Sequence, residues 1–416
     1  MLDRIINPYK KIESAVLFMI AAEFLVQMVN AAFMMVLNIY LAKKGYSDPE
    51  IADFISWRFL SVMALAFPLG LFIKGRKIIP FFYVASIGVS VFSFLILLSV
   101  EYQWTFLIPI FLASWGISFA FMQVLAMPFI LRNTSAENQS AAISLSYSTY
   151  SFGMITAGTL IYLLHWSNEV FFDEFKSLIV LSVLSIVSVF FVIKIGRSEV
   201  VPKFEGKRKD LGNFDWKVIA MAMTPSLILA VGAGLTIPFI NLFFFKVYGM
   251  SAELFSIVNA FSSVTVAFAA LLVPHIKTKY GYKVAITRTQ TIAVVSLALL
   301  AITEFYKTEG WAYFAAVFFF LLRQPLMNMA APATSELVMN YVGPKNQEII
   351  SALTASIWSG SWFLSAIIFR VFRNNGMMYA NVFLITAALY ALGVLWYYFL
   401  IRAYHKKSLS NAVATD

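Results

Sequence analysis

Long apolar segments follow one another along almost the whole chain, and they constrain the fold more than any other feature. A helix of about 20 mostly apolar residues is long enough to cross a bilayer. Only 12% of the 416 residues are charged, against about 25% in a soluble domain. We therefore expect an all-α integral membrane protein. Its twelve predicted transmembrane helices span residues 14–42, 50–73, 78–100, 104–131, 138–164, 176–195, 217–247, 252–276, 284–304, 311–341, 347–371 and 378–402.

The longest polar stretch between these segments falls after the sixth and is rich in Lys and Arg. We interpret it as a solvated linker that divides the chain into two halves. The predicted domains are an N-terminal six-helix bundle over 1–196, a basic cytoplasmic linker over 197–215 and a C-terminal six-helix bundle over 216–416. Six helices plus six indicate a parallel duplication, with two pseudo-symmetric bundles.

The positive charges gather in the loops on one side of the predicted membrane. Of the 31 Lys and Arg residues, 22 fall on the side that holds both termini and the linker, and seven fall on the other side. Cytoplasmic loops carry such an excess, so we expect both termini in the cytoplasm of a multi-pass protein of the inner or plasma membrane. We therefore interpret the net charge of +10 as a signal that orients the protein in the bilayer, and not as a sign of nucleic-acid binding. We expect a monomer.

Several kinds of chemistry are excluded by what the sequence lacks. It has no cysteine and only three histidines, His165, His275 and His405, which are far apart. Thiolate catalysis and cysteine metal sites are excluded, and we expect no metal and no cofactor. No Walker loop is present, so ATP hydrolysis by that route is excluded. Because no catalytic cluster of carboxylates or histidines occurs, we expect that the protein is not an enzyme.

Ionisable residues inside membrane segments are costly and are candidates for function. The first segment carries Glu23, Gln27 and Asn30 at i, i+4 and i+7, which places them on one helix face. Such a face is expected to line a water-filled cavity. Glu23 is either a protonatable coupling group or one half of a structural ion pair with an arginine on a neighbouring helix.

The two arginines that lie inside segments are further coupling or gating candidates. Arg58 lies in the second segment, where Asp53 can pair with it, and either a structural role or a salt bridge that gates the site is possible. Arg323 lies near the middle of the tenth segment, too deep to reach the surface easily. Because arginine keeps its charge, we expect an anionic partner for it. That partner is Glu23 in the other half or an anionic group of a bound solute.

Other polar and aromatic side chains in the segments are candidates for lining a substrate cavity. With Gln27 and Asn30, the predicted lining residues are Gln123, Tyr147, Asn328 and Trp358. Tyr147 and Trp358 lie on faces that also carry small hydroxyl residues, which more often serve close helix packing. Pro325 and Pro332 flank Asn328 and are expected to kink the tenth segment.

The layout resembles the major facilitator superfamily. In that family the loop after the second helix of each half typically reads Gly-x-x-x-Asp-Arg-x-Gly-Arg-Lys. Here the C-terminal copy, Pro274–Lys283, keeps Gly281 and the final lysine but has Thr278 where Asp is usual. The N-terminal copy, Gly70–Lys77, is shortened and also lacks the Asp. The resemblance covers the whole chain in layout and only a few residues in motif.

The resemblance implies a secondary active transporter that moves a small organic solute by alternating access. With no ATP site, uphill movement has to use an ion gradient, and protons acting through Glu23 are the expected choice. Export of drugs or amphiphiles and uptake of an organic anion stay open as alternatives. The export alternative is weakened because Ser114-Trp115-Gly116 stands where drug antiporters of this family usually carry an arginine. A non-transporting membrane receptor is the alternative of a different class.

Overall fold

The computed structural model of the chain describes residues 12–73, 76–135, 138–196, 199, 215–343 and 347–413, which form helices joined by short turns and loops. No strand occurs within these residues. The prediction of an all-α fold is therefore confirmed. The residues between the described ranges include most of the predicted linker, and the linker prediction lies largely outside the described residues.

The chain forms two compact units. The first comprises Met1–Lys207 with Met250–Ala260, and the second comprises Arg208–Gly249 with Phe261–Asp416. The two units share helix α12, because the first residues of that helix pack with the first unit. The predicted boundaries at 196 and 216 stay predictions.

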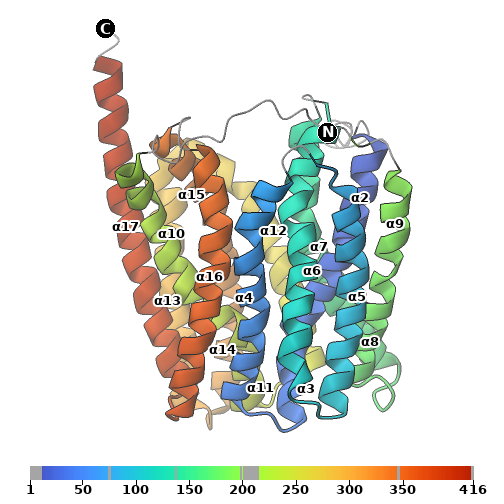
Figure 1. Cartoon of the computed structure of the whole chain (residues 1–416). Coiled ribbons are helices and arrows are strands. Elements are labelled where there is room, and N and C mark those ends of the chain that lie inside the picture. The colour runs from blue at the N-terminus through green and yellow to red at the C-terminus, as the bar shows by residue number, and fades with distance from the viewer. Residues whose placement is uncertain are drawn as a thin grey trace. The chain divides into compact units, whose positions relative to one another are not determined.

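The first unit is built from long helices that run alongside one another (Figure 1). Its closest helix pairs are α4 with α6, α2 with α7 and α5 with α6. In chain order the elements are α2 (Ser14–Ala32), the π-helix η1 (Phe33–Leu37), α3 (Asn38–Lys43), α4 (Asp48–Phe72), α5 (Ile79–Glu101), α6 (Leu107–Asn133), α7 (Gln139–Ser167), α8 (Glu174–Ser185) and α9 (Val187–Ile195).

The second unit has the same all-helical character, and α10 packs against both α16 and α17. Its elements are α10 (Trp216–Thr236), the 3₁₀ turn η3 (Ile237–Phe239), α11 (Ile240–Tyr248), α12 (Ala252–Tyr282), the π-helix η4 (Lys283–Arg288), α13 (Thr289–Ile302), the 3₁₀ turn η5 (Thr303–Tyr306), α14 (Gly310–Asn328), α15 (Ala330–Val342), α16 (Gln347–Asn374) and α17 (Tyr379–Val413).

Each of the twelve predicted segments coincides with one of these helices or with consecutive helices. Nine spans within the described residues are long and apolar enough to cross a membrane. The three other predicted segments are α4, α7 and α16, single helices of 25, 29 and 28 residues. The structure therefore describes a multi-pass membrane protein, and the count of twelve stays a prediction.

Local chemistry explains where several helices begin and where one is interrupted. Ser47 and Glu50 form a capping box at the start of α4, and the side chain of Asp173 accepts from the backbone N–H of Lys176 at the start of α8. Such caps satisfy the free N–H groups of a first turn. The tenth segment breaks between α14 and α15, because Pro332 has no N–H to offer the carbonyl of Asn328.

The first and seventh segments are both interrupted near their middle. The helix of the first changes to π-helical geometry at Phe33–Leu37, and that of the seventh changes to 3₁₀ geometry at Ile237–Phe239, which contains Pro238. Helices with such breaks often border functional sites in membrane transporters.

Candidate functional site

A row of polar side chains on α2 forms the centre of the candidate site in the first unit. Glu23 and Asn30 are buried, and Gln27 between them is partly buried. The amide of Asn30 donates to the side-chain oxygen of Gln27 at 3.1 Å. The predicted common face of these three residues is therefore consistent with the geometry of the helix.

Glu23 lies against α7. Its carboxylate accepts a 2.7 Å hydrogen bond from the hydroxyl of Ser146, and only 6% of the residue is exposed. Among the described residues Glu23 has no ion pair with Lys, Arg or His. An ionised carboxylate buried without a cation carries a large desolvation cost, and protonation removes that cost. The structural alternative, an ion pair with a neighbouring arginine, has no support within the described residues.

Arg58 on α4 is held by neutral groups. Its guanidinium donates to the side-chain oxygen of Asn30, and one terminal nitrogen lies 3.7 Å from the sulfur of Met34. The guanidinium carbon lies 4.3 Å from the ring centre of Trp115 on α6. A buried cation over an indole ring gains about 2 kcal/mol, which offsets part of the desolvation cost. The contacts that the structure gives for Arg58 therefore differ from the predicted pairing with Asp53.

Trp115 is fixed in place behind Arg58. Its indole N–H donates to the hydroxyl of Ser93 on α5 at 2.8 Å, and the residue is fully buried. Gly116 beside it allows α4 and α6 to approach closely. A Cβ at this position would lie 2.2 Å from the hydroxyl oxygen of Ser61 and 2.6 Å from the backbone carbonyl oxygen of Arg58. The close helix crossing therefore positions the backbone that carries the arginine.

Arg323 belongs to the second unit and points from α14 toward α17. It donates to the hydroxyl of Tyr390 at 3.0 Å and to the side-chain oxygen of Gln324 at 2.6 Å. The residue is 1% exposed, and its Nε has no hydrogen-bond partner within the described residues. The same part of the chain offers it no carboxylate within ion-pair distance. The contacts that the structure gives for Arg323 are with two neutral groups of its own unit, and the expected anionic partner, Glu23 or a bound solute, stays a prediction.

The other predicted cavity residues are spread over both units. Gln123 on α6 and Tyr147 on α7 are exposed in the first unit, and Asn328 and Trp358 are exposed in the second. The amide of Asn328 donates back to the carbonyl of Gln324 in its own helix at 2.8 Å. Their contribution to a substrate cavity stays a prediction.

Sequence reasoning missed three residues that contact the predicted charged side chains within each unit. Ser146, Trp115 and Tyr390 are the partners of Glu23, Arg58 and Arg323. Trp115 and Tyr390 are bulky residues with one polar atom inside apolar segments, which is a detectable signal, because such atoms need a partner when buried. Ser146 gives no such signal among the many hydroxyl residues of α7.

The loops that resemble the family motif are held by ion pairs in each unit. In the first unit Arg132 donates to the carbonyls of Ile73 and Arg76 and lies 3.8 Å from the buried carboxylate of Glu199. In the second unit Lys277 pairs with Glu336 at 2.5 Å. Both loops lack the Asp that is usual in the family, and in both a Glu from another segment provides the negative charge nearby.

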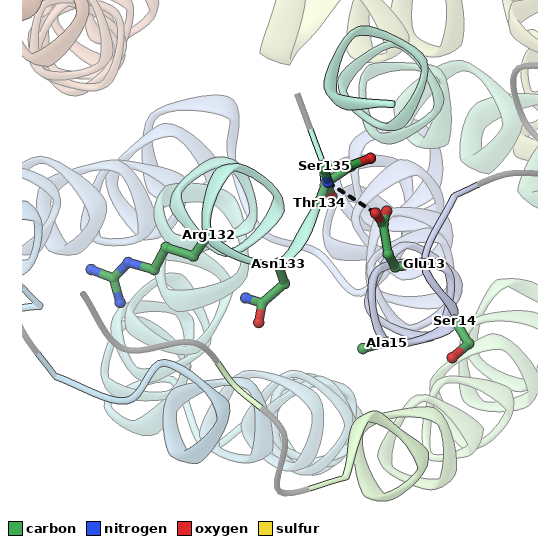
Figure 2. Close-up of a pocket in the computed structure, with 7 residues that line it drawn as sticks. All are labelled: Glu13, Ser14, Ala15, Arg132, Asn133, Thr134 and Ser135. Atoms are coloured by element: carbon green, nitrogen blue, oxygen red, sulfur yellow. Dashed lines mark hydrogen bonds between the residues drawn. The ribbon is translucent and has the colours of Figure 1, made fainter. Parts of the chain in front are cut away.

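A hollow of about 450 Å³ lies beside Arg132, at the end of the first unit where α2 begins (Figure 2). Glu13 in its wall accepts a 2.9 Å hydrogen bond from the backbone N–H of Ser135. Partial burial tends to raise the pKa of Glu13, but the hydrogen bonds from Ser135 and Asn138 outweigh it and hold that pKa below its usual value. The hollow is lined by polar ends of helices and is separate from the row on α2.

Comparison with known proteins agrees with a polytopic membrane transporter. A family model described as the Major Facilitator Superfamily matches residues 19–366, and the chain belongs to that superfamily. Its members are secondary transporters and not enzymes, as predicted. No curated protein sequence matches the chain.

Solved structures of several transporters share the fold. A D-xylose–proton symporter is 13% identical, with a TM-score of 0.72, and the match covers 92% of this chain and 96% of that one. The nucleoside transporter NupG is 18% identical, with a TM-score of 0.68 and coverage of 94% and 99%. A bacterial homolog of the human lysosomal transporter Spinster is 13% identical, with a TM-score of 0.68 and coverage of 94% and 97%. At such identities the likeness extends to the fold alone.

Within the described residues no group of three or more His, Asp or Glu side chains could hold a metal ion. In each unit the candidate residues are buried charges that contact neutral hydrogen-bonding groups and aromatic rings. Such an arrangement can bind a proton or a polar solute, and it offers no catalytic constellation.

Proposed function

We propose that the protein couples the movement of a small organic solute to protons, with Glu23 as the proton-binding group. The observation that carries this proposal is a buried carboxylate whose described partner is a neutral hydroxyl, that of Ser146. Such a group changes its charge more readily than one fixed in an ion pair, because no cation stabilises the ionised form.

The row of polar residues supports a link between the proton and the solute. Glu23 lies one turn before Gln27, Gln27 accepts from Asn30, and Asn30 accepts from Arg58. A change of charge on Glu23 can therefore alter a network that reaches another helix. A solute that hydrogen-bonds to Gln27 or Asn30 would compete with these internal bonds, so proton binding and solute binding would affect each other.

The class of solute is proposed as polar and without net charge. Arg58 is already engaged with Asn30 and lies over an indole ring, and Arg323 contacts Tyr390 and Gln324. These contacts weaken the alternative of organic anion uptake. The solved neighbours include transporters of a nucleoside and of a sugar, which agrees with this class without deciding it. Drug or amphiphile export stays the second candidate because of the many aromatic residues.

The test is solute-dependent proton movement in liposomes that contain a pH-sensitive dye. With Glu23→Gln we expect gradient-driven accumulation of solute to be lost while solute exchange continues. Glu101→Gln is the matched control, because this carboxylate lies at the end of α5 and pairs with Lys44 at 2.7 Å, and it should keep coupling. Unchanged concentrative transport in Glu23→Gln would reject the proposal.

The proposed orientation has both termini in the cytoplasm of the inner or plasma membrane. Because the sequence has no cysteine, a thiol reagent reacts only with a single cysteine that is introduced. A membrane-impermeant thiol reagent applied to intact cells should label Lys44→Cys and should not label Lys77→Cys. The reverse pattern would overturn the orientation.

A further inference from the structure

A groove of about 310 Å³ lies in the second unit between α13 with its preceding π-helix η4 and α17. On one side it is lined by Thr287, Thr291 and Val294, and on the other by Ala391, Val394, Leu395 and Tyr398. The residues from 391 to 398 cover about 10 Å of helix length, so the groove runs along α17 for two turns.

The groove wall is apolar in character although it contains two threonines. The hydroxyl of Thr291 donates to the carbonyl of Thr287 at 2.7 Å, and the hydroxyl of Thr287 donates to the carbonyl of Lys283. Both hydroxyls are therefore used within their own helix. A chain of methylene groups suits such a wall better than a polar solute does.

Two cations lie at the end of this groove. Lys283 is one turn before Thr287, and Arg402 is one turn after Tyr398. The ammonium of Lys283 lies 5.5 Å and the guanidinium of Arg402 lies 4.5 Å from the centre of the Tyr398 ring. Neither has a carboxylate partner among the described residues. Two cations against one ring, with no carboxylate paired to either in the described part of the chain, leave a place where negative charge is stabilised.

We propose that this groove binds an anionic phospholipid, with an acyl chain along α17 and the headgroup phosphate between Lys283 and Arg402. Both cations belong to the side of the membrane that the Lys and Arg distribution assigns to the cytoplasm, and the apolar groove continues from them toward the middle of the bilayer. Basic residues at the cytoplasmic ends of helices bind anionic headgroups in this way. The proposal does not depend on the identity of the transported solute or on Glu23.

The experiment measures lipid binding to purified, delipidated protein by native mass spectrometry and by melting temperature. Phosphatidylglycerol and phosphatidylcholine with identical acyl chains are compared. We expect tighter binding of phosphatidylglycerol to the wild type. Replacing one cation, Lys283→Ala or Arg402→Ala, should weaken that binding by about fivefold, and the double variant should lose the preference. Equal binding of the two lipids to the wild type, or a preference retained by the double variant, would overturn the proposal.

Further measurements separate the effect of the two cations from that of the apolar groove, and binding of a lipid from binding of free phosphate. Lys194→Ala is the matched control, because this lysine lies 4.5 Å from the Phe190 ring in the other unit, and it should keep the preference. Ala391→Phe fills the groove and should weaken binding of both lipids. Glycerol phosphate, which has the headgroup phosphate without acyl chains, should not raise the melting temperature. If it stabilises the wild type as much as phosphatidylglycerol does, the site binds free phosphate and the lipid proposal fails.

Discussion

The hydroxyl of Ser146 donates a 2.7 Å hydrogen bond to the carboxylate of Glu23, and this bond joins the middle of α2 to α7. A serine hydroxyl can donate to an ionised carboxylate or accept from a protonated one. The contact therefore suits both charge states of Glu23, whereas an arginine in the same place would favour only the ionised state. This property makes the pair suitable for binding and releasing a proton.

A double-mutant cycle measures how much the hydrogen bond between Ser146 and Glu23 contributes to the stability of the protein. Ser146→Ala leaves a buried carboxyl group without its described partner, which costs about 1–3 kcal/mol. The same substitution in a Glu23→Ala background should cost much less, because no carboxyl group is then left unpartnered. Melting temperatures of the four proteins give the result. Equal losses in both backgrounds would show that the hydrogen bond contributes nothing measurable.

Trp115 is predicted to matter for stability through both its ring and its indole N–H. Trp115→Phe keeps a ring near Arg58 but loses the bond to Ser93, at a cost of about 1 kcal/mol. Trp115→Leu also removes the contact of the cation with an aromatic face, which adds about 2 kcal/mol. The melting temperature should therefore fall in the order wild type, Phe variant, Leu variant. A Leu variant as stable as the Phe variant would contradict the role of the ring.

Gly116 and Gly310 form a matched pair for testing the close approach of α4 and α6. Gly116→Ala places a methyl group 2.6 Å from the carbonyl oxygen of Arg58, so the two helices have to separate. Overpacking of this kind costs about 1–3 kcal/mol. Gly310→Ala meets no atom within 4 Å and should be neutral or slightly stabilising. Thermal unfolding in detergent compares the two, and equal effects would show that the crossing tolerates a side chain.

The fold was predictable because a bilayer restricts a chain to few solutions. Every backbone polar group in the hydrocarbon region has to be satisfied within a helix or a closed barrel, so long apolar segments predict helices directly. The interruption near Asn328 also follows from sequence, because Pro332 cannot donate to its carbonyl. The π-helical turn at Phe33–Leu37 could not be predicted, because no proline or glycine occurs in it.

The candidate site was predictable only in part. The cost of burying charge identifies Glu23, Arg58 and Arg323 from sequence. Their partners depend on which helix faces which, and periodicity within one helix does not contain that information. The expected pairing of Glu23 with Arg323 joins residues of two units and stays a prediction, whereas the contact of Arg323 with Tyr390 lies within one unit.

The hydrogen bond from the backbone N–H of Ser135 to the carboxylate of Glu13 predicts a pH-dependent contribution to stability. The pKa of Glu13 is lowered in the folded protein, so its stabilising effect is complete above the unfolded value of 4.5 and is lost as the pH falls through the lower folded value. Glu13→Gln should lower the free energy of unfolding at pH 7 by at most about 0.5 kcal/mol, because solvent screens a group that is only partly buried, and the melting temperature should fall slightly. The difference from wild type should vanish in acid.

The control for this experiment is Glu309→Gln, because the Glu309 side chain makes no cap hydrogen bond at the start of α14. It should show no comparable difference from wild type at either pH. If the melting temperature of Glu13→Gln fell further below that of the wild type as the pH decreased, the lowered pKa of Glu13 would be contradicted.

Tyr390→Phe distinguishes the two roles proposed for Arg323. The variant removes only the hydroxyl that accepts from the guanidinium, and a hydrogen bond to a charged group contributes about 1.5–3 kcal/mol. If Arg323 holds α14 against α17, the melting temperature falls by several degrees and the remaining transport keeps its proton coupling. If Arg323 instead acts on the solute or on the gate, the same small change alters the apparent affinity or the coupling ratio at unchanged stability. The contacts of Arg323 with neutral groups favour the first outcome, and liposome transport measured beside thermal unfolding decides between them.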